Sequence, residues 1–170
     1  MEDDKQVLVL PPFRQAPALE LDLGRVREAE ARIVEAKTVN PVTYKDLEYT
    51  FNEAWRDLKR YLSAVGYQVA MAEKAMEEAK ANVFLDRYPE FMAGKPKSHD
   101  NADMRKAFLS RDEEYSQALD RFNQLKAVES MLDGKAKSLE NVCRYMKKSM
   151  DLVLRSGLSG ADLYVTHNRK

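Results

Sequence analysis

Apolar residues recur at alternating spacings of four and three along the middle of the chain, between residues 51 and 83. The members of this row are Phe51, Trp55, Leu58, Leu62, Val65, Val69, Ala72, Met76, Ala79 and Val83. Such spacing is typical of a helix that packs one stripe lengthwise against a second helix. At a rise of about 1.5 Å per residue the stripe is roughly 48 Å long, which one small globular core does not cover. We therefore expect a second long helix beside it, from this chain or from another copy.

A second row with the same spacing follows between residues 115 and 153. Its members are Tyr115, Ala118, Phe122, Leu125, Glu129, Leu132, Ala136, Leu139, Cys143, Met146, Met150 and Val153. Ser110 and Glu113 have the spacing of a capping box that opens this helix, and Gly157 is expected to end it. Glu129 is the one charged member of the row. Such a residue either fixes the register or oligomeric state, or reaches the edge of the packing.

Residues 1–22 read as an extended arm rather than as helix. The arm contains a strand-like apolar run at 7–10, which two prolines stop. Because the arm is so apolar, we expect it to dock on its own helices or on a neighbouring subunit. Leu-Tyr-Val at 163–165, in the tail formed by residues 158–170, is a second strand-like run. A pairing of the two runs, within one copy or between copies, is one arrangement that this composition suggests.

Shorter helices are predicted around the two rows. A first helix is expected over about 24–38, with Asp22 as its N-cap. Thr43 is expected to cap the long helix that carries the first row. Prolines, a glycine and polar turn formers over 88–101 predict a connector, and a short helix is expected over about 102–109.

These elements predict an all-α fold: a long antiparallel helical hairpin, coiled-coil-like, with a short helix at its tip, an extra N-terminal helix and extended terminal arms. The expected organisation is an arm at 1–22, a helical-hairpin domain at 23–157 and a tail at 158–170. The sequence leaves open whether the two rows pair within one chain or between chains, and apolar residues outside the rows favour packing between copies. The residues expected to form the hairpin seam or oligomer contacts are Trp55, Leu62, Val69, Met76, Phe122, Leu132, Leu139 and Met146.

Charge and cysteine content limit the classes of function that the sequence allows. Lys and Arg together number 28, as do Asp and Glu, so no global positive field attracts nucleic acid. Residues 134–170 nevertheless hold eight bases against three acids, which suits an acidic partner or a phosphate backbone, or a solvated helix face. The single cysteine, Cys143, excludes an intrachain disulfide, and its place in the second row predicts a structural thiol in a reducing compartment. The start is acidic and no apolar run reaches membrane-spanning length, so we expect a cytoplasmic protein with no membrane partner.

Catalytic and metal-binding patterns are not found in the sequence. His99 and His167 have no Cys, Asp or Glu at metal-ligand spacing, and no glycine-rich phosphate loop is present. We therefore expect a protein that is not an enzyme and that holds no metal or cofactor.

Bases alternate with aromatic residues where the hairpin is expected to turn. Cations along the backbone and aromatic rings under the bases are the combination that holds single-stranded nucleic acid. The competing interpretation is an ordinary helix end whose aromatic residues pack inward. The candidate DNA-binding residues are Arg87, Tyr88, Lys95, Lys97, Arg105 and Lys106.

Three short motifs occur in order along residues 45–157. A long helix runs into Leu-Asp-x-Tyr at 85–88, a short helix runs into Leu-Ser-x-Asp within 104–112, and the last helix reaches Arg-Ser-Gly at 155–157. In this order of parts the chain resembles the UvsY-type recombination mediators of T-even phages and the related small helical proteins of other tailed phages.

The resemblance implies a non-enzymatic, ring-like oligomer that binds single-stranded DNA. Such a mediator helps to load a RecA-like recombinase onto DNA coated with single-strand-binding protein. The family's DNA contact includes a Lys-x-Arg, and the matching positions here are the uncharged Asn82 and Phe84. DNA binding would then depend on Arg87, Lys95, Lys97, Arg105 and Lys106.

Two functions therefore remain. The first is a homo-oligomeric phage recombination mediator in the cytoplasm of the host cell. The second is a structural or assembly protein, a virion component or a scaffold, built from multimerised hairpins with no nucleic-acid role. A protein that binds one partner through an exposed helix face is a third reading.

Overall fold

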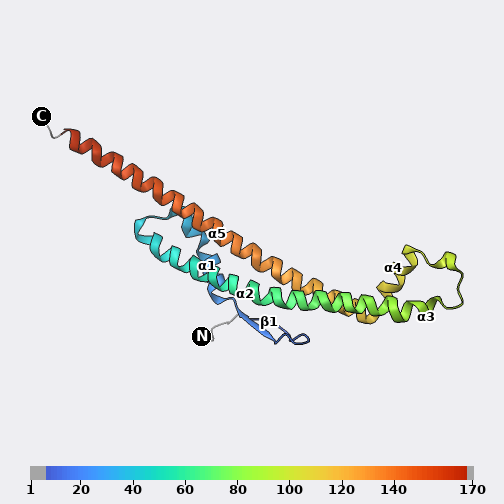
Figure 1. The fold of residues 1–170 in the computed structure, drawn as a ribbon. Helices are drawn as coiled ribbons and strands as arrows, with labels where there is room; N and C mark the ends of the chain where they lie inside the picture. The colour runs from blue at the N-terminus through green and yellow to red at the C-terminus, as the bar shows by residue number, and fades with distance from the viewer. Residues whose placement is uncertain (1–6, 168–170) are drawn as a thin grey trace. The chain divides into compact units, whose positions relative to one another are not determined.

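The computed structural model describes residues 7–167, with the side chains of residue 97 and of residues 157–167 outside the description. The protein is mostly helical, as expected, with one small two-stranded sheet (Figure 1). The described elements are β1 (Val7–Leu10), β2 (Leu19–Asp22), α1 (Gly24–Arg32), the 3-10 helix η1 (Ile33–Thr38), α2 (Pro41–Asn82), the π-helical turn η2 (Val83–Arg87), α3 (Tyr88–Met92), the 3-10 turn η3 (Lys97–His99), α4 (Ala102–Arg111) and α5 (Glu113–His167). No helix in this range is both long enough and apolar enough to cross a membrane.

The chain divides into two compact units, and α2 and α5 run through both. The described residues of the first unit are 7–8, 20–61 and 132–167, and those of the second are 9–19 and 62–131. The first unit holds α1, η1, the start of α2 and the end of α5. The second holds the rest of α2, the turn elements η2 to α4, and the start of α5.

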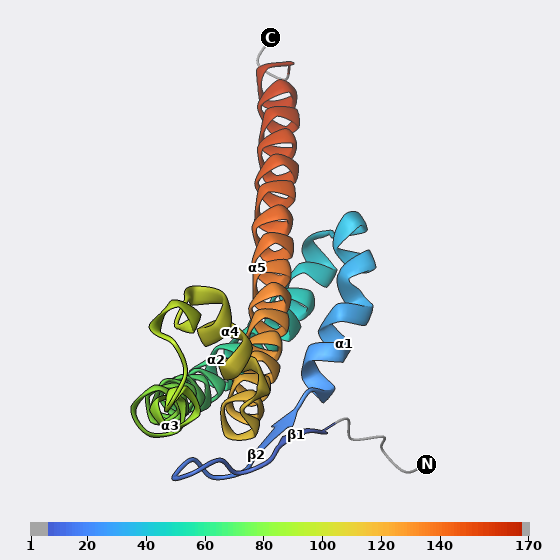
Figure 2. The same cartoon turned by 90° about the vertical axis from the view of Figure 1, so that its right-hand side faces the viewer.

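The arm forms a tight hairpin rather than a free extension. The strand expected at 7–10 is present as β1, and it pairs with β2 (Figure 2). Phe13 and Ala16 exchange backbone hydrogen bonds of 3.0 and 2.8 Å across the turn, which places Arg14 at positive φ, 52°. The suggested pairing with residues 163–165 is wrong, because β2 is the partner of β1 and residues 163–165 are helical.

The first helix is divided into two parts. The expected span of 24–38 is covered by α1 and then by the tighter η1. Asp22 accepts a hydrogen bond of 2.9 Å from the backbone N–H of Gly24, although the N-cap residue is Leu23, which provides no side-chain cap. Asp22 therefore supports the start of α1 through this hydrogen bond, although it lies one residue before the N-cap position.

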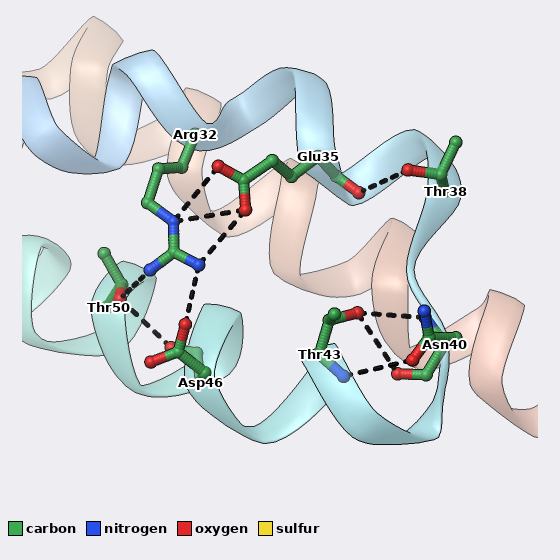
Figure 3. A network of polar contacts seen from close by, with 7 residues as sticks. All are labelled: Arg32, Glu35, Thr38, Asn40, Thr43, Asp46 and Thr50. Carbon is green, nitrogen blue, oxygen red and sulfur yellow. Dashed lines mark hydrogen bonds and ion pairs between the residues drawn. The ribbon is translucent and has the colours of Figure 1, made fainter.

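Arg32 lies where α1 meets η1 and joins both to α2 (Figure 3). Its guanidinium donates to Glu35 at 3.1 Å and to Asp46 at 2.6 Å. It also donates to the Thr50 hydroxyl at 3.1 Å. The two carboxylates raise the pKa of Arg32, with the Glu35 hydrogen bond as the largest cause. A single side chain thus holds the helix junction of the first unit to the first turns of α2.

The start of α2 is capped by Asn40 and not by Thr43. The Asn40 side-chain oxygen accepts hydrogen bonds from the backbone N–H groups of Val42 and Thr43, at 2.9 and 3.1 Å. Pro41 occupies the first helical position, where its missing N–H is not needed. The prediction that Thr43 is the cap was therefore wrong. An Asn-Pro pair is also typical of a turn, but here Asn40 and Pro41 together form the helix start.

The start of α5 is capped by Asp112 and not by Ser110. The Asp112 side chain accepts a hydrogen bond of 3.0 Å from the Tyr115 backbone N–H. The hydroxyl of Ser110, in contrast, donates to the Ala107 carbonyl inside α4. The short helix expected at the tip is present as α4, with Asn101 as its N-cap.

Apolar side chains from α2 and α5 form the core of the first unit. The fully buried large residues of these two helices are Leu47, Phe51, Leu58, Leu132, Leu139 and Met146, and Val26 of α1 joins them. Lys135 of α5 pairs with Glu30 of α1. Lys147 of α5 lies 3.9 Å from Glu48 of α2.

Small side chains dominate the core of the second unit. Its buried residues include Val65, Val69, Ala72, Ala75, Ala79, Val83 and Leu125. Glu129, the charged member of the second row, pairs with Lys126 at 2.9 Å. A Cβ on Gly66 would lie 3.6 Å from a Glu129 carboxylate oxygen, so Glu129 passes close beside α2 at this glycine.

The buried face of α2 is rotated by one residue from the predicted row at several turns. Ala54, Tyr61 and Ala75 are buried, whereas their predicted neighbours Trp55, Leu62 and Met76 are half-buried. The arm explains this shift at Tyr61, whose hydroxyl donates to the Asp22 carbonyl at 2.8 Å. The spacing of apolar residues alone predicts which face of the helix is buried. It does not predict that the arm also packs on this helix.

The last helix is longer than expected. α5 continues through Gly157 to His167, so the predicted end at Gly157 is wrong. A glycine favours a helix end but does not require one. Figure 1 shows α5 continuing past the start of α2. The side chains of residues 151–156 are all exposed.

Candidate nucleic-acid interface

One π-helical turn, η2, connects α2 to α3 and sets the geometry of residues 83–111, the segment between α2 and α5 that is called the tip below. The backbone N–H of Tyr88 donates to the carbonyl of Val83, five residues earlier instead of the usual four. The extra residue keeps Tyr88 on the buried face that Val83 occupies, and both are buried. Leu85, inside the turn, faces outward and is 74% exposed. Pro89 then lies in the first turn of α3, so the helix continues past this proline instead of ending before it.

Aromatic rings from η2, α3 and α4 form one cluster. The Tyr88 ring centroid lies 5.4 Å from that of Phe108 and 5.9 Å from that of Phe84, both near edge-to-face. The centroids of Phe91 and Phe108 are 4.7 Å apart. Tyr88 is only 6% exposed, and Phe91 is the most exposed of the tip aromatics at 37%. The rings therefore pack mainly on one another, as in the competing interpretation of this segment.

Tyr88 and Arg105 meet at Asp100. The Tyr88 hydroxyl donates to an Asp100 oxygen at 2.8 Å, and Arg105 donates to both Asp100 oxygens at 2.7 and 2.8 Å. These bonds, with Arg105 first and Tyr88 second, lower the pKa of Asp100 to about 2. Burial, followed by the bond to Asp100, raises the pKa of Tyr88. The network fastens the loop before α4 to α3.

Arg87 closes the other side of the tip. Its guanidinium pairs with Asp112 and with Glu114, at the start of α5. Because Asp112 also caps α5, Arg87 links η2 to the helix start that Asp112 defines. The charge of Arg87 is thus matched by two carboxylates of the same chain.

The remaining candidate cations differ in their surroundings. The Lys95 ammonium lies 2.9 Å from the centroid of the Phe91 ring. Lys106 is exposed, and no ion pair joins it to a described residue. The side chain of Lys97 lies outside the described residues. Arg111, at the end of α4, is also exposed with no ion pair to the described residues, and it was not among the predicted DNA-binding residues.

Of the six predicted DNA-binding residues, the structure brings Tyr88 and Arg105 into one network. It places Arg87 in a separate one. The tip is therefore an aromatic cluster in which Arg87 and Arg105 are held by carboxylates of the same chain, with further cations at its surface. This arrangement suits electrostatic contact with phosphates better than stacking on bases. Among the described residues, no group of His, Cys, Asp and Glu is placed to hold a metal ion.

The predicted seam residues lie on the core side of both helices. Val69, Leu132, Leu139 and Met146 are buried, whereas Trp55, Leu62, Met76 and Phe122 are half-buried. The Lys59 ammonium lies 5.4 Å from the centroid of the Trp55 ring. Cys143 is half-buried, and burial raises the pKa of its thiol.

Gln68 is a buried polar residue that was not predicted from the sequence. It is 1% exposed, and its amide donates to the Pro17 carbonyl at 2.8 Å. Its side-chain oxygen accepts from Arg121 at 3.4 Å, and Arg121 donates to the Pro11 carbonyl at 2.8 Å. The two side chains hold the arm to the second unit. Gln68 lies seven residues from Tyr61 and from Ala75, and that heptad spacing was the available signal.

Comparisons with known proteins give no match for this chain. No protein-family model, no curated protein and no solved structure matches the chain.

Proposed function

We propose that α2 and α5 form one antiparallel hairpin with α3 and α4 at its tip. One contact between α2 and α5 in each unit supports the antiparallel order. In the first unit Glu48 meets Lys147, and in the second Gly66 meets Glu129. Rising numbers in α2 thus accompany falling numbers in α5. The alternating rows of four and three then pair along the coiled-coil-like seam.

The hairpin assembles into a homo-oligomer, and the end of α5 carries this proposal. Val153 continues the face of Met146 and Met150, which are buried, yet it is 45% exposed. Leu154 beside it is 58% exposed. A helix that extends into water without a packed face is marginal. A second copy that covers residues 151–167 would bury these side chains and stabilise the extension.

The assembled protein acts as a recombination mediator that binds single-stranded DNA. Among the described side chains of one tip, few cations are free of intrachain ion pairs, so one copy binds weakly. Several tips held in one oligomer bind a single strand with much higher avidity. In this proposal the oligomer works in the cytoplasm of the phage's host and has a RecA-like recombinase and a single-strand-binding protein as partners. It needs no cofactor and catalyses no reaction.

A double variant, Val153→Glu with Leu154→Glu, tests assembly and DNA binding together. We expect light scattering after size exclusion to give a smaller mass than for the wild type. Fluorescence anisotropy with a labelled oligothymidine should show affinity reduced at least about tenfold, because avidity is lost. Ser156→Glu is the matched control, since it adds charge to the same segment without removing an apolar side chain. A wild type that is monomeric, or that binds no oligonucleotide at low salt, would refute the mediator proposal.

The internal ion pairs of Arg87 and Arg105 favour a second candidate function. In this alternative the chain is a structural or assembly protein, in the virion or on a scaffold. Arg87 and Arg105 are both held by carboxylates, and Tyr88 is buried. The two candidates separate in a Lys95→Glu, Lys106→Glu double variant. A mediator loses DNA binding and recombinase loading while its oligomeric mass stays unchanged. A structural protein with this variant assembles and functions as the wild type does.

A further inference from the structure

An apolar groove lies in the first unit, between η1 and α5. Its volume is about 550 Å³. The lining residues are Ile33, Ala36, Lys37, Ser138, Asn141, Val142 and Tyr145. Neither the proposed hairpin seam nor the tip uses these residues. Tyr145 is 51% exposed.

The α5 wall of the groove is a helical stripe distinct from the core face. Ser138, Val142 and Tyr145 follow one another at spacings of four and three, so they lie on one side of α5. The core face is instead marked by the buried Leu139 and Met146. Regular spacing of this kind presents ridges and grooves that fit the side chains of another helix.

Two cations that have no ion pair with a described residue border this stripe. Lys148 follows Tyr145 by three residues along α5, and Lys37 lines the groove from η1. In contrast, Lys137 and Arg144 nearby pair with Asp133 and Glu140 on the same helix. The border of the groove therefore keeps an unbalanced positive charge beside an apolar floor.

We propose that this groove binds an acidic amphipathic helix of a partner protein. The partner's apolar stripe would cover Val142 and Tyr145, while its carboxylates would meet Lys37 and Lys148. Electrostatic complementarity of this kind raises the association rate and selects acidic over basic partners. The exposed end of α5 from a second copy suits the groove poorly, because residues 147–156 carry three bases and one acid. The proposal depends on neither DNA binding nor the contact through Val153 and Leu154.

A pair of designed peptides tests the charge preference. The first is a fluorescein-labelled helix with leucine at positions i, i+3, i+4 and i+7 and glutamate on both flanks. The second has lysine in place of every glutamate. We expect the wild-type protein to bind the acidic peptide at least about tenfold more tightly than the basic one in anisotropy titrations. Equal binding of the two peptides, or saturation by neither, would overturn the proposal.

Three variants locate the binding site. Val142→Glu should weaken binding of the acidic peptide at least about tenfold, because it places a like charge on the groove floor. Lys148→Glu and Tyr145→Ser, both at exposed positions, should weaken it severalfold without loss of helical circular dichroism. Asp120→Asn, on the same helix and outside the groove, removes an exposed carboxylate that has no ion pair with a described residue; it is the control and should leave binding unchanged. If all three variants bind as the wild type does, or if Val142→Glu lowers the oligomeric mass, the groove is not this site.

Discussion

Two glycines in the chain lie in contrasting backbone settings. Gly134 lies inside α5, and nothing is within 4 Å of a Cβ placed on it. Gly94 follows α3 and has φ of 78°, a conformation that favours glycine. The same substitution should therefore have opposite effects at the two positions.

Replacing Gly134 by alanine should stabilise the protein by about 1 kcal/mol, because alanine has the higher helix propensity and meets no neighbour. Gly94→Ala should destabilise it by about 1 kcal/mol, because the side chain strains a left-handed backbone. The free energy of unfolding from urea titration measures both. If Gly134→Ala is destabilising, the surface of α5 at this residue is covered by something, and a second copy becomes the first candidate.

Asp100 makes the tip sensitive to acid. The hydrogen bonds from Arg105 and Tyr88 lower its pKa from 3.8 to about 2. The stabilisation is therefore complete above about pH 4, where the carboxyl is ionised in both the folded and the unfolded chain. It is lost as the pH falls towards 2.

The Asp100→Asn variant should remove this part of the acid sensitivity. We expect the difference in melting temperature between wild type and variant to be largest above pH 4 and to shrink as the pH approaches 2. The other carboxylates titrate in both proteins and cancel in the difference. A difference that stays constant over this pH range would show that Asp100 does not carry the effect.

Among the elements, the π-helical turn η2 decides whether the buried face of α2 reaches the tip. Its extra residue restores the helical phase, so that Tyr88 follows Val83 on the core side. Deleting Asp86, which is exposed, would shorten this spacing to the four residues of an ordinary α-helix and keep Tyr88 on the same face.

A pair of deletions separates this explanation from general damage to the helix. Deleting Asp86 should lower the melting temperature by only a few degrees, equivalent to about 1–2 kcal/mol in a domain of this size. Deleting Glu77 should cost several kcal/mol, because it turns Ala79, Val83 and Tyr88 away from the core by about 100°. Thermal melts followed by circular dichroism compare the two. Equal losses would mean that η2 does not set the phase.

The same elements show which parts of the fold spacing can predict. The two long helices were predictable because their buried stripe repeats over many turns. A single residue that departs from the pattern does not obscure a repeat of this length. The π turn was not, since one inserted residue leaves no signature in composition. The caps at Asn40 and Asp112 were missed because Thr43 and Ser110 also satisfy the local rule. The partners of Arg87 and Gln68 come from distant segments, so no local pattern contains them.

At the scale of the whole molecule, positive and negative charges balance. The net charge is zero, and two arginines of the tip, Arg87 and Arg105, are held by carboxylates. Few of the tip's described side chains are cations without an ion pair, so in the proposed mediator the affinity for DNA depends on how many tips act together. This dependence can be measured through salt.

The slope of log affinity against log salt counts the phosphates that a protein contacts. For single strands it is about −0.7 per contact, so the four cations Lys95, Lys97, Lys106 and Arg111 would give about −3 for one tip. We expect the wild-type slope to be steeper than this value, because several tips engage one strand. The Val153→Glu, Leu154→Glu variant should give a slope no steeper than about −3. If the variant keeps the wild-type slope while its mass has fallen, the DNA contact lies elsewhere on a single copy, and the basic half of α5 is the next surface to mutate.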